Sequence, residues 1–288
     1  MKVLVTGSKG QLGTELRALG AGYTGFDFTF IDIEELDLSV AGNIDNFFSS
    51  RSFDAIVNCA AYTAVDKAEQ EQELAGKLNR DLPGRLAGIA QNMKAVFIHI
   101  STDYVFDGQN FRPYTEEDVP NPLSAYAKSK YAGELEIREN SKDSIIIRTS
   151  WLYSSSGTNF VKTILRLASE QGRLKVVYDQ VGCPTYARDL AKIILDILPA
   201  ARTISGIGVF HYSNEGAISW YDFAKAIVEL SGIPCIIEPI ETRDFPTPAV
   251  RPFYSVLNKA RIKKQFNIEI PYWKDSLSEC LRQLKSTN

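Results

Sequence analysis

Histidines, cysteines and long apolar runs are all scarce in this chain of 288 residues. Only His99 and His211 are present, so a metal site built from several histidines is excluded. The four cysteines lie far apart and none has a neighbour at metal-ligand spacing, which predicts reduced thiols in a cytoplasmic protein. No apolar run approaches the ~18 residues of a membrane-spanning helix, and the N-terminal run is too short for a signal peptide. We therefore expect no membrane partner.

A basic excess is also missing, because the formal net charge is −3. Nucleic-acid-binding proteins usually carry a surplus of lysine and arginine, so no nucleic-acid partner is expected. An anionic ligand would need locally placed hydrogen-bond donors instead of a general positive field. With 44% hydrophobic residues, the chain can bury the core of one large domain or of two closely joined ones.

In the first half, short apolar runs alternate with longer amphipathic ones, which is typical of βαβ units and a parallel sheet. The strands are apolar throughout and do not alternate, as expected for a sheet that is covered on both faces. We expect a doubly wound α/β sheet of the Rossmann type, with residues 1–150 as a dinucleotide-binding domain. The predicted strands are residues 2–6, 27–31, 55–58, 95–100 and 144–148, and the predicted helices start near 11 and span 44–51, 69–93 and 124–139.

After about Trp151 this rhythm loosens. Four prolines and several charges between residues 238 and 252 predict a loop there. We expect residues 151–288 to form mainly a smaller, substrate-binding lobe at the ligand edge of the sheet, with some segments returning to the sheet. The predicted helices here are 159–170, 187–198, 220–230 and 275–285, and the predicted strands are 175–178 and 209–212.

A glycine-rich segment, Thr6 to Gly13, connects the first predicted strand to the first predicted helix. Gly7 permits a tight turn, Gly10 lets the backbone approach a pyrophosphate, and Gly13 lets the helix pack on the strand. The helix N-terminus then offers free N–H groups to an anion. This position between strand and helix predicts that a dinucleotide binds here.

Acidic residues follow the second predicted strand. Asp32, at the end of that strand, could accept a hydrogen bond from a ribose 2′-OH, or it could merely cap a turn. Asp37 and Leu38 are a second candidate position, near the adenine. Lys9 could instead meet a 2′-phosphate, so the residues leave the choice between NADH and NADPH open.

Tyr126 and Lys130 are four residues apart at the start of a predicted helix, so they lie on one face, one turn apart. A tyrosine hydroxyl normally has a pKa near ~10 and is a slow acid at neutral pH. A neighbouring ammonium should lower that pKa and help the hydroxyl to protonate an alkoxide. We therefore predict that Tyr126 is a general acid.

A hydroxyl at the end of the preceding strand should complete this group. Ligands of open α/β sheets bind beyond the carboxyl ends of the strands, where Ser101 and Thr102 stand. A hydroxyl there can donate to a substrate carbonyl and hold it against Tyr126. We choose Thr102, with Ser101 as the competing candidate.

Together these motifs resemble the dTDP-4-dehydrorhamnose reductases, a family of the extended and atypical short-chain dehydrogenases. The resemblance covers nearly the whole chain in order, and STDYVFDG and DKAE are its most specific parts. It implies an NAD(P)H-dependent reduction of the 4-keto group of dTDP-4-dehydro-6-deoxy-L-mannose, a nucleotide sugar, to dTDP-L-rhamnose for bacterial polysaccharides. The matching segments are TGSKGQLG, NCAAYTAVDKAE, STDYVFDG, YAKSK, RTSWLY and RPFYSVLN.

The resemblance also implies individual roles. Thr102, Tyr126 and Lys130 match the catalytic triad of the family. Positions that match cofactor-binding segments are Gly10, Gln11 and Leu12 in the phosphate loop and Ala60, Ala61, Tyr62 and Thr63 after the third strand. Positions that match substrate contacts are Asp103, Tyr104, Trp151, Asn159, Phe160, the run from Asp179 to Thr185, and Arg251, which could pair with a diphosphate.

Some relatives hold Mg²⁺ between the subunits of a homodimer through carboxylates. Glu15 and Asp189 are available here, but Arg188 is basic where an acidic ligand would be expected. This departure argues against a metal-linked dimer.

Two other functions compete with a reductase. An epimerase or 4,6-dehydratase of the same superfamily would recycle its cofactor, but a dehydratase would want a glutamate after Asp103, where Tyr104 stands. A non-catalytic subunit, like the regulatory beta subunit of methionine adenosyltransferase, would keep the Rossmann lobe without turnover. The complete set Thr102, Tyr126 and Lys130 favours an enzyme.

Overall fold

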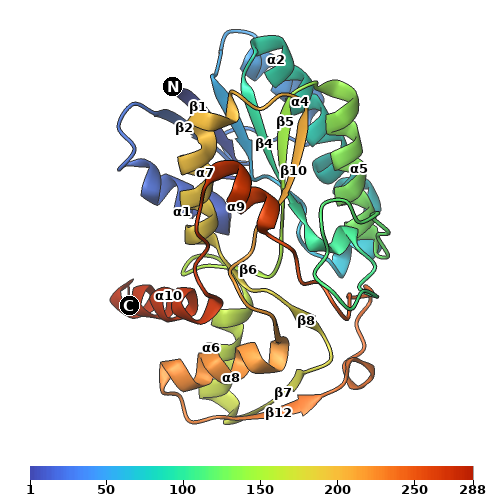
Figure 1. Cartoon of the computed structure of the whole chain (residues 1–288), viewed down its shortest axis with the longest axis vertical. Helices are drawn as coiled ribbons and strands as arrows, with labels where there is room; N and C mark the ends of the chain where they lie inside the picture. The colour runs from blue at the N-terminus through green and yellow to red at the C-terminus, as the bar shows by residue number, and fades with distance from the viewer. Residues whose placement is uncertain (288) are drawn as a thin grey trace.

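The computed structural model describes residues 1–287, with side chains up to Ser286. A parallel sheet of six strands, in the order β2-β1-β3-β4-β5-β10, forms the upper part of the molecule in Figure 1. This confirms the predicted doubly wound α/β fold. The strands are β1 (Lys2–Thr6), β2 (Asp27–Ile31), β3 (Ala55–Asn58), β4 (Val96–Thr102), β5 (Ser144–Thr149) and β10 (Ile207–His211).

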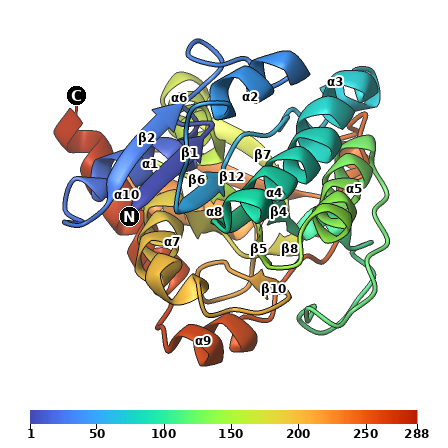
Figure 2. The same cartoon turned by 90° about the horizontal axis from the view of Figure 1, so that it is seen from above.

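Helices cover both faces of the sheet, as Figure 2 shows from above. Alternate residues of each strand point to opposite faces. Val3 and Val5 thus pack with the apolar side chains of α1 and α7, whereas Leu4 packs with those of α2 and α4. Two buried faces explain why the strands are apolar throughout. The covering helices are α1 (Gln11–Gly20) and α7 (Ala187–Ala201) on one face, and α2 (Ala41–Phe48), α4 (Leu82–Met93) and α5 (Ala125–Asn140) on the other.

The single helix predicted for residues 69–93 is divided. It contains the short helix α3 (Gln72–Gly76), a π turn η2 (Lys77–Asp81) and α4, preceded by the 3₁₀ turn η1 (Lys67–Glu69). In the π turn the side chain of Asn79 is fully buried and bonds both the N–H and the C=O of Tyr62, each at 2.9 Å. Because the side-chain amide of Asn79 must reach the backbone of Tyr62, the helix widens to a π turn here.

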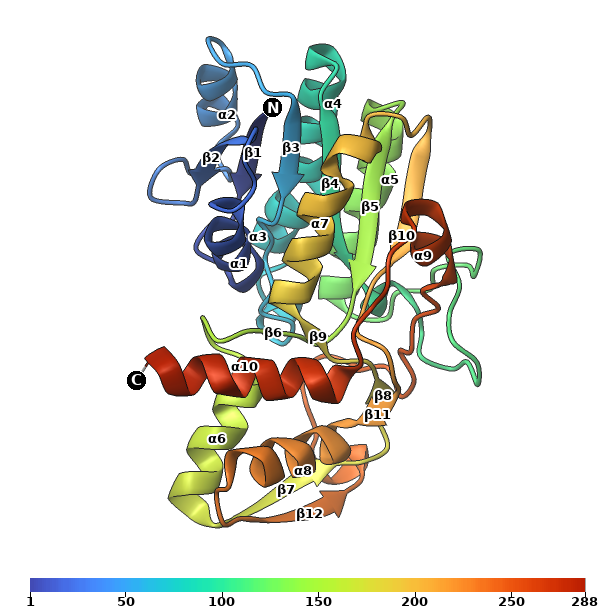
Figure 3. The same ribbon diagram turned by 60° about the vertical axis from the view of Figure 1, so that its left-hand side comes forward.

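A second lobe lies below the sheet and has an aromatic core of its own (Figure 3). Helix α10 (Trp273–Thr287) runs between the sheet and this lobe. The prediction of a loop for residues 238–252 is wrong at its start, because β12 includes Glu238 to Ile240 and the 3₁₀ turn η4 (Thr242–Asp244) follows. Pro239 is tolerated because β12 has a single partner strand, so one edge needs no N–H donor. The lobe also contains α6 (Phe160–Gln171), α8 (Trp220–Ser231) and β7 (Arg173–Val177), with β12 spanning Ile236–Ile240.

Several segments after residue 151 return to the sheet. Strand β10 pairs with β5, α7 packs against α1, and α9 (Ala260–Phe266) lies beside β10. Within the described part of the chain, no helix is long and apolar enough to cross a membrane. Short elements connect the two lobes, namely η3 (Asp103–Val105), β6 (Leu152–Tyr153), β8 (Val181–Gly182), β9 (Thr185–Tyr186) and β11 (Ile218–Ser219).

Candidate active site

A cavity of about 790 Å³ opens at the carboxyl ends of the strands. It begins where β1 and β3 lie side by side, the point at which the strand order reverses. Open α/β sheets bind their ligands at such a point, because the loops after the two strands run in opposite directions and leave a crevice. The cavity continues past β4 and α5 to Trp151 and Asn159.

The glycine loop fits its predicted geometry. Gly7 has a φ of +62°, and a Cβ placed on it would lie 2.7 Å from the nitrogen of Ala60. A Cβ on Gly13 would lie 2.3 Å from the carbonyl oxygen of Gly7. Gly10 is the N-cap of α1 and provides no side-chain cap. The first N–H groups of α1 are therefore open to an anion in the cavity. Gln11 and Leu12 line the same wall.

Beyond the glycine loop the cavity has an acidic rim, which we define as Asp32, Glu34, Glu35 and Asp37. The carboxylate of Asp32 accepts hydrogen bonds from the backbone N–H of Lys9 at 2.7 Å and of Ile33 at 2.8 Å. The ammonium of Lys9 pairs with Glu34 and lies 3.5 Å from Glu35. The charge of Lys9 is thus already neutralised. Leu38 is a further residue of the cavity wall.

Tyr126 and Lys130 lie on the cavity face of α5, which begins at Ser124, where the serine hydroxyl accepts the N–H of Ala127. Burial raises the pKa of Tyr126 to about 12, and the neighbouring side chain of Thr102 opposes this shift in part. The prediction that Lys130 lowers this pKa is wrong, because burial dominates and Nζ of Lys130 bonds the carbonyl of Ile100 instead.

Lys130 is only 2% exposed. Its Nζ donates to the carbonyl of Ile100 at 2.7 Å and lies 3.2 Å from Nε2 of His99. Burial lowers the pKa of Lys130 to about 8, partly opposed by Glu134 one turn further along α5. An amine in this range can gain or lose a proton near neutral pH.

The structure separates the two candidate hydroxyls at the end of β4. Ser101 donates to the buried carboxylate of Glu134 at 2.5 Å and so serves the packing of α5. Thr102 faces Tyr126 and donates to Oδ1 of Asp103 at 3.1 Å. Burial raises the pKa of Asp103 to about 6. Thr102 is therefore the hydroxyl that lies beside Tyr126 in the cavity.

The far wall of the cavity belongs to the second lobe. Trp151 has a φ of +47°, which is unfavourable for a side chain of its size. Its ring stacks on Trp220 with 3.5 Å between centroids, and a Cβ on Gly182 would come within 2.6 Å of it. Asn159 caps α6 and donates to the side chain of Gln11 at 2.9 Å, which joins the lobe to the glycine loop. Strain held in place by packing is frequent at binding sites.

Three single residues selected from the sequence, and the whole run from Asp179 to Thr185, do not line the cavity. The hydroxyl of Tyr62 donates to Glu71 at 2.6 Å, whereas its neighbours Ala60, Ala61 and Thr63 do line the wall. Phe160 packs on Trp220 in the core of the second lobe. Arg251 pairs with Asp66 at 2.8 Å and sits outside the wall, although it is close enough to Tyr104 to influence its pKa.

Sequence reasoning missed several wall residues. Most of them are apolar or small side chains next to a selected motif, so proximity to that motif was the available signal. They are Ile33, Leu36, Ser39, Cys59, Val65, Leu74, Leu78, Ile100, Thr149, Ser150, Leu152, Gly157 and Thr158. Trp220, behind Trp151, carried no motif and could only be found from the fold.

The residues named for Mg²⁺ do not fit a metal site. Glu15 accepts a hydrogen bond from Arg188 at 3.2 Å, and Asp189 accepts bonds from Asn214 and Ser276. Within residues 1–287 no group of three or more histidine, cysteine or acidic side chains could hold a metal ion. The guanidinium of Arg188 already balances the charge of Glu15.

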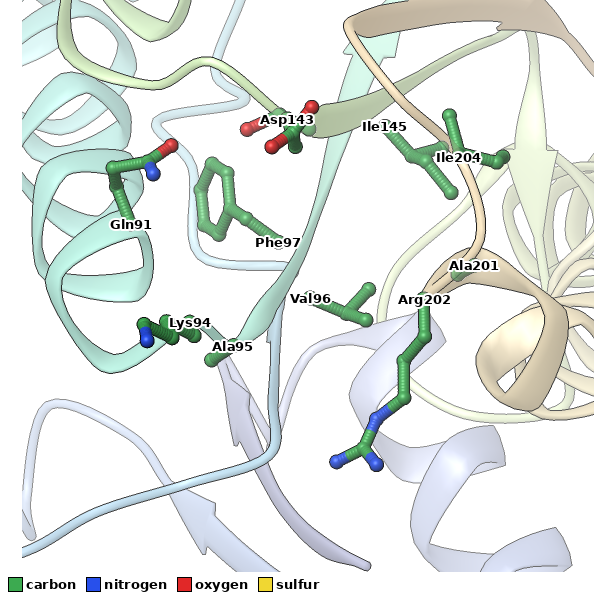
Figure 4. Close-up of a pocket in the computed structure, with 11 residues that line it drawn as sticks. Gln91, Lys94, Ala95, Val96, Phe97, Asp143, Ile145, Ala201, Arg202 and Ile204 are labelled. Atoms are coloured by element: carbon green, nitrogen blue, oxygen red, sulfur yellow. The ribbon is translucent and has the colours of Figure 1, made fainter.

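A second hollow of about 420 Å³ lies at the opposite end of the sheet (Figure 4). Three of its polar side chains are bound to other parts of the chain. Asp143 accepts the N–H of Gly206 at 2.7 Å, Arg202 pairs with Asp54 at 2.7 Å, and Gln91 accepts the N–H of Lys142 at 2.8 Å. This hollow offers no grouping like that of Thr102 and Tyr126.

The parallel sheet, the glycine loop after β1 and the Tyr-Lys pair on α5 place the chain among the Rossmann-type short-chain dehydrogenases. The chain belongs to the family described as RmlD substrate binding domain, which matches residues 1–286.

Named relatives agree with this assignment. The chain is 38% identical to dTDP-4-dehydrorhamnose reductase of Burkholderia thailandensis, over 99% of this chain and 100% of the relative. It is 39% identical to the spore coat polysaccharide biosynthesis protein SpsK of Bacillus subtilis, over 99% of this chain and 98% of the relative.

Solved structures agree as well. A dTDP-4-dehydrorhamnose reductase of Clostridium acetobutylicum superposes with a TM-score of 0.94 and 41% identity, over 99% of this chain and 100% of that one. The enzyme of Bacillus anthracis in complex with NADP superposes with a TM-score of 0.92 and 35% identity, over 98% of this chain and 99% of that one.

Proposed function

We propose that this chain is an NAD(P)H-dependent reductase that converts dTDP-4-dehydrorhamnose to dTDP-L-rhamnose. The observation that carries the proposal is the pair of hydroxyls of Tyr126 and Thr102, which meet in the cavity between a dinucleotide loop and a second lobe. The named relatives, at 38% identity over nearly the full length, support this substrate. A polysaccharide pathway in the bacterial cytoplasm is the setting in which the product would be used.

The cavity fits a nicotinamide dinucleotide. The N–H groups at the start of α1, from Gly10 to Gly13, would hold the pyrophosphate, because no side-chain cap from Gly10 competes for them. Ala60, Ala61 and Thr63 would line the cofactor, and Lys130 would bond the ribose next to the nicotinamide. When bound, the reduced nicotinamide supplies the hydride. Every other requirement of the reaction falls on side chains of the chain itself.

Tyr126 provides the proton. Because burial raises the pKa of Tyr126 to about 12, the hydroxyl stays protonated at neutral pH and is ready to donate. An alkoxide forming on the substrate is a stronger base than the phenolate, so proton transfer from Tyr126 is downhill. Thr102 lies beside it and would donate to the same oxygen, which stabilises the developing charge.

The acidic rim favours NADH over NADPH in this chain. A 2′-phosphate would add about two negative charges next to Asp32, Glu34, Glu35 and Asp37, and the nearest cation, Lys9, is already paired. A 2′-hydroxyl can instead donate to a carboxylate of this rim. The complex of the Bacillus anthracis relative contains NADP, so the preference rests on the rim of this chain alone.

The second lobe would hold the nucleotide sugar, and residues 151–288 supply most of it. Trp151, Asp103, Tyr104 and Asn159 line the cavity on the side away from the glycine loop and would contact the sugar. Phe160 would act indirectly, by supporting Trp220 under Trp151. Arg251 would have to leave Asp66 to meet a diphosphate. The homodimer stays a prediction from the family resemblance.

The test is Tyr126→Phe, assayed by oxidation of NADH and of NADPH with dTDP-4-dehydrorhamnose as substrate. We expect kcat to fall by ~10²–10⁴, the usual contribution of a general acid, while the affinity for the dinucleotide is retained. Tyr131→Phe is the matched control, since Tyr131 lies on the same helix but packs against Val105 and Phe106, and it should keep normal turnover. Near-normal kcat in Tyr126→Phe would refute the proposal.

A further inference from the structure

A buried polar chain lies directly behind Lys130. It consists of Thr6 on β1, Asn58 on β3 and His99 on β4, and all three side chains are fully buried. The neighbouring core is apolar, so each polar atom here needs a partner. The direction of each hydrogen bond can be followed along this series, from Thr6 to His99.

The backbone provides the first donor of this series. The N–H of Ala60 donates to Oγ1 of Thr6 at 3.3 Å, and Thr6 donates its own proton to Oδ1 of Asn58 at 2.6 Å. The Nδ2 amide of Asn58 therefore faces Nδ1 of His99, 3.0 Å away, and donates to it. A neutral imidazole that accepts at Nδ1 carries its proton on Nε2.

The Nε2 of His99 lies 3.2 Å from Nζ of Lys130. An ammonium has only donors and cannot accept this N–H, whereas a neutral amine has a lone pair that can. The amine still donates to the carbonyl of Ile100, at 2.7 Å. With the proton of His99 on Nδ1 instead, the amide of Asn58 would have to turn around so that its oxygen faces the imidazole. The hydroxyl of Thr6 would then lose the acceptor that it has now.

We propose that His99 is a positioning residue that presents its Nε2–H to Lys130 and thereby favours the neutral amine. The series of hydrogen bonds that runs from the N–H of Ala60 through Thr6 and Asn58 holds His99 in this tautomer. Lys130 would then exchange its proton near the working pH of the enzyme, and the reaction would lose rate at high pH as the ammonium disappears. The kinetic part of this inference rests on the proposed function, but the tautomer does not.

Of the other charged and titratable groups around Lys130, some favour its ammonium form and others do not. Cys59, after β3, is a neutral thiol because burial raises its pKa to about 12. Glu134 favours the ammonium, but its carboxylate is paired with Arg148 from β5 at 2.6 Å. Tyr126, one turn earlier on α5, stays protonated. Burial next to Lys130 keeps the pKa of His99 well below its ordinary value, so an imidazolium does not compete.

The chain contains its own control for a tautomer measurement. Its only other histidine is His211, which is also fully buried and whose Nδ1 faces the carbonyl of Tyr114 at 3.1 Å. A carbonyl can only accept, so His211 must carry its proton on Nδ1. Ring ¹⁵N shifts of histidine-labelled protein, recorded above about pH 7, should show the Nε2–H tautomer for His99 and the Nδ1–H tautomer for His211.

The finding that would overturn the proposal is His99 as the Nδ1–H tautomer or as an imidazolium throughout this range. Because the measurement uses the unmodified protein, it does not depend on whether a variant folds.

The second test measures the pKa of Lys130 by NMR of ¹³Cε-labelled lysine, assigned by loss of the signal in Lys130→Met. In His99→Phe, which keeps a buried ring but removes the donor, we expect this pKa to rise by about one unit, a tenfold change in proton affinity. His211→Phe should leave it unchanged. An equal or lower pKa in folded His99→Phe would count against the proposal.

The high-pH limb of kcat/KM should move with the pKa of Lys130 in the same variants. If the tautomers are as expected but no variant or wild-type sample reduces the substrate, the proposed function fails and this inference survives.

Discussion

The two ends of the same parallel strands differ sharply in how their polar groups are used. At the carboxyl ends, Thr102, Tyr126 and Lys130 converge in one cavity. At the amino ends, Asp143, Arg202 and Gln91 surround a hollow, but each is bound to a neighbouring segment of the chain. The strands themselves carry buried polar side chains toward their carboxyl ends, among them Asn58, Thr102 and Thr149. Chemistry at that end therefore comes from the strand ends together with the loops and helix starts that follow them, as in other open α/β sheets.

The largest expected difference between the two ends concerns stability. Glu134 and Arg148 form an ion pair that is 3% exposed or less, next to the cavity face of α5. Glu134→Gln would leave the guanidinium buried without a counter-charge, which should lower the free energy of unfolding by about 3–5 kcal/mol. At the other end Arg202 and Asp54 are about half exposed, so Arg202→Ala should cost at most about 1 kcal/mol.

Urea unfolding of both variants measures this difference. Equal losses of unfolding free energy in Glu134→Gln and Arg202→Ala would show that burial does not distinguish the ion pairs at the two ends of the sheet.

Next in size is the contrast between two adjacent hydroxyls. Thr102→Val removes the donor that faces Tyr126, and kcat should fall by ~10²–10³. Ser101→Ala removes the hydrogen bond to Glu134 and should cost about 1 kcal/mol of stability while kcat changes little. Steady-state kinetics and unfolding curves of the two variants decide between them. If Ser101→Ala has the larger effect on kcat, the assignment of the two hydroxyls must be reversed.

Asp103 should make stability depend on pH with an unusual sign. Its folded pKa, about 6, lies above the ordinary value of 3.8, so the folded chain binds the proton more tightly. Stability is therefore lost as the pH rises from about 4 to 6, by up to about 3 kcal/mol. Asp103→Asn should be more stable than wild type at pH 8 and equal to it near pH 4, measured by urea unfolding.

Asp118 is the control with the opposite sign. Arg112 and the backbone N–H of Thr115 lower its pKa to about 2, so its contribution is present at neutral pH and is lost in acid. Asp118→Asn should be less stable than wild type at pH 7. A gain in stability for Asp118→Asn, or none for Asp103→Asn, would contradict the burial argument.

The smallest effect is expected at the acidic rim. Replacing Glu34 and Glu35 together by glutamine should raise kcat/KM for NADPH relative to NADH by roughly fivefold at low salt, since exposed charges interact weakly in water. Glu170→Gln changes an acid of the second lobe that pairs with Arg166 and should leave the ratio unchanged. A ratio that does not respond to the rim would remove the basis for an NADH preference.

Local spacing predicted the parts of the site that lie on one element. The glycine loop between β1 and α1, and the separation of Tyr126 from Lys130 by one helical turn, both follow from the backbone geometry of a few consecutive residues. The helix predicted at 69–93 is present from Gln72 to Met93, but it contains a π turn where Asn79 bonds Tyr62, and no local pattern reveals such a partner.

Contacts between distant segments decided the rest. Arg251 has the chemistry to bind a diphosphate, yet it pairs with Asp66, which is far away in the sequence. Phe160 and Tyr62 stand beside cavity residues in the sequence, but packing turns them away from the cavity. Position along a motif therefore did not determine which side chain reaches the cavity.

The amino-acid sequence by itself determined the doubly wound sheet, the anion-binding loop and the Tyr-Lys pair, because apolar periodicity and helical spacing are local properties. Only the tertiary structure decided that Thr102 and not Ser101 faces Tyr126, and that burial keeps this phenol protonated while it brings Lys130 close to neutrality. Desolvation depends on everything that surrounds a group, and those surroundings come from segments far apart in the chain.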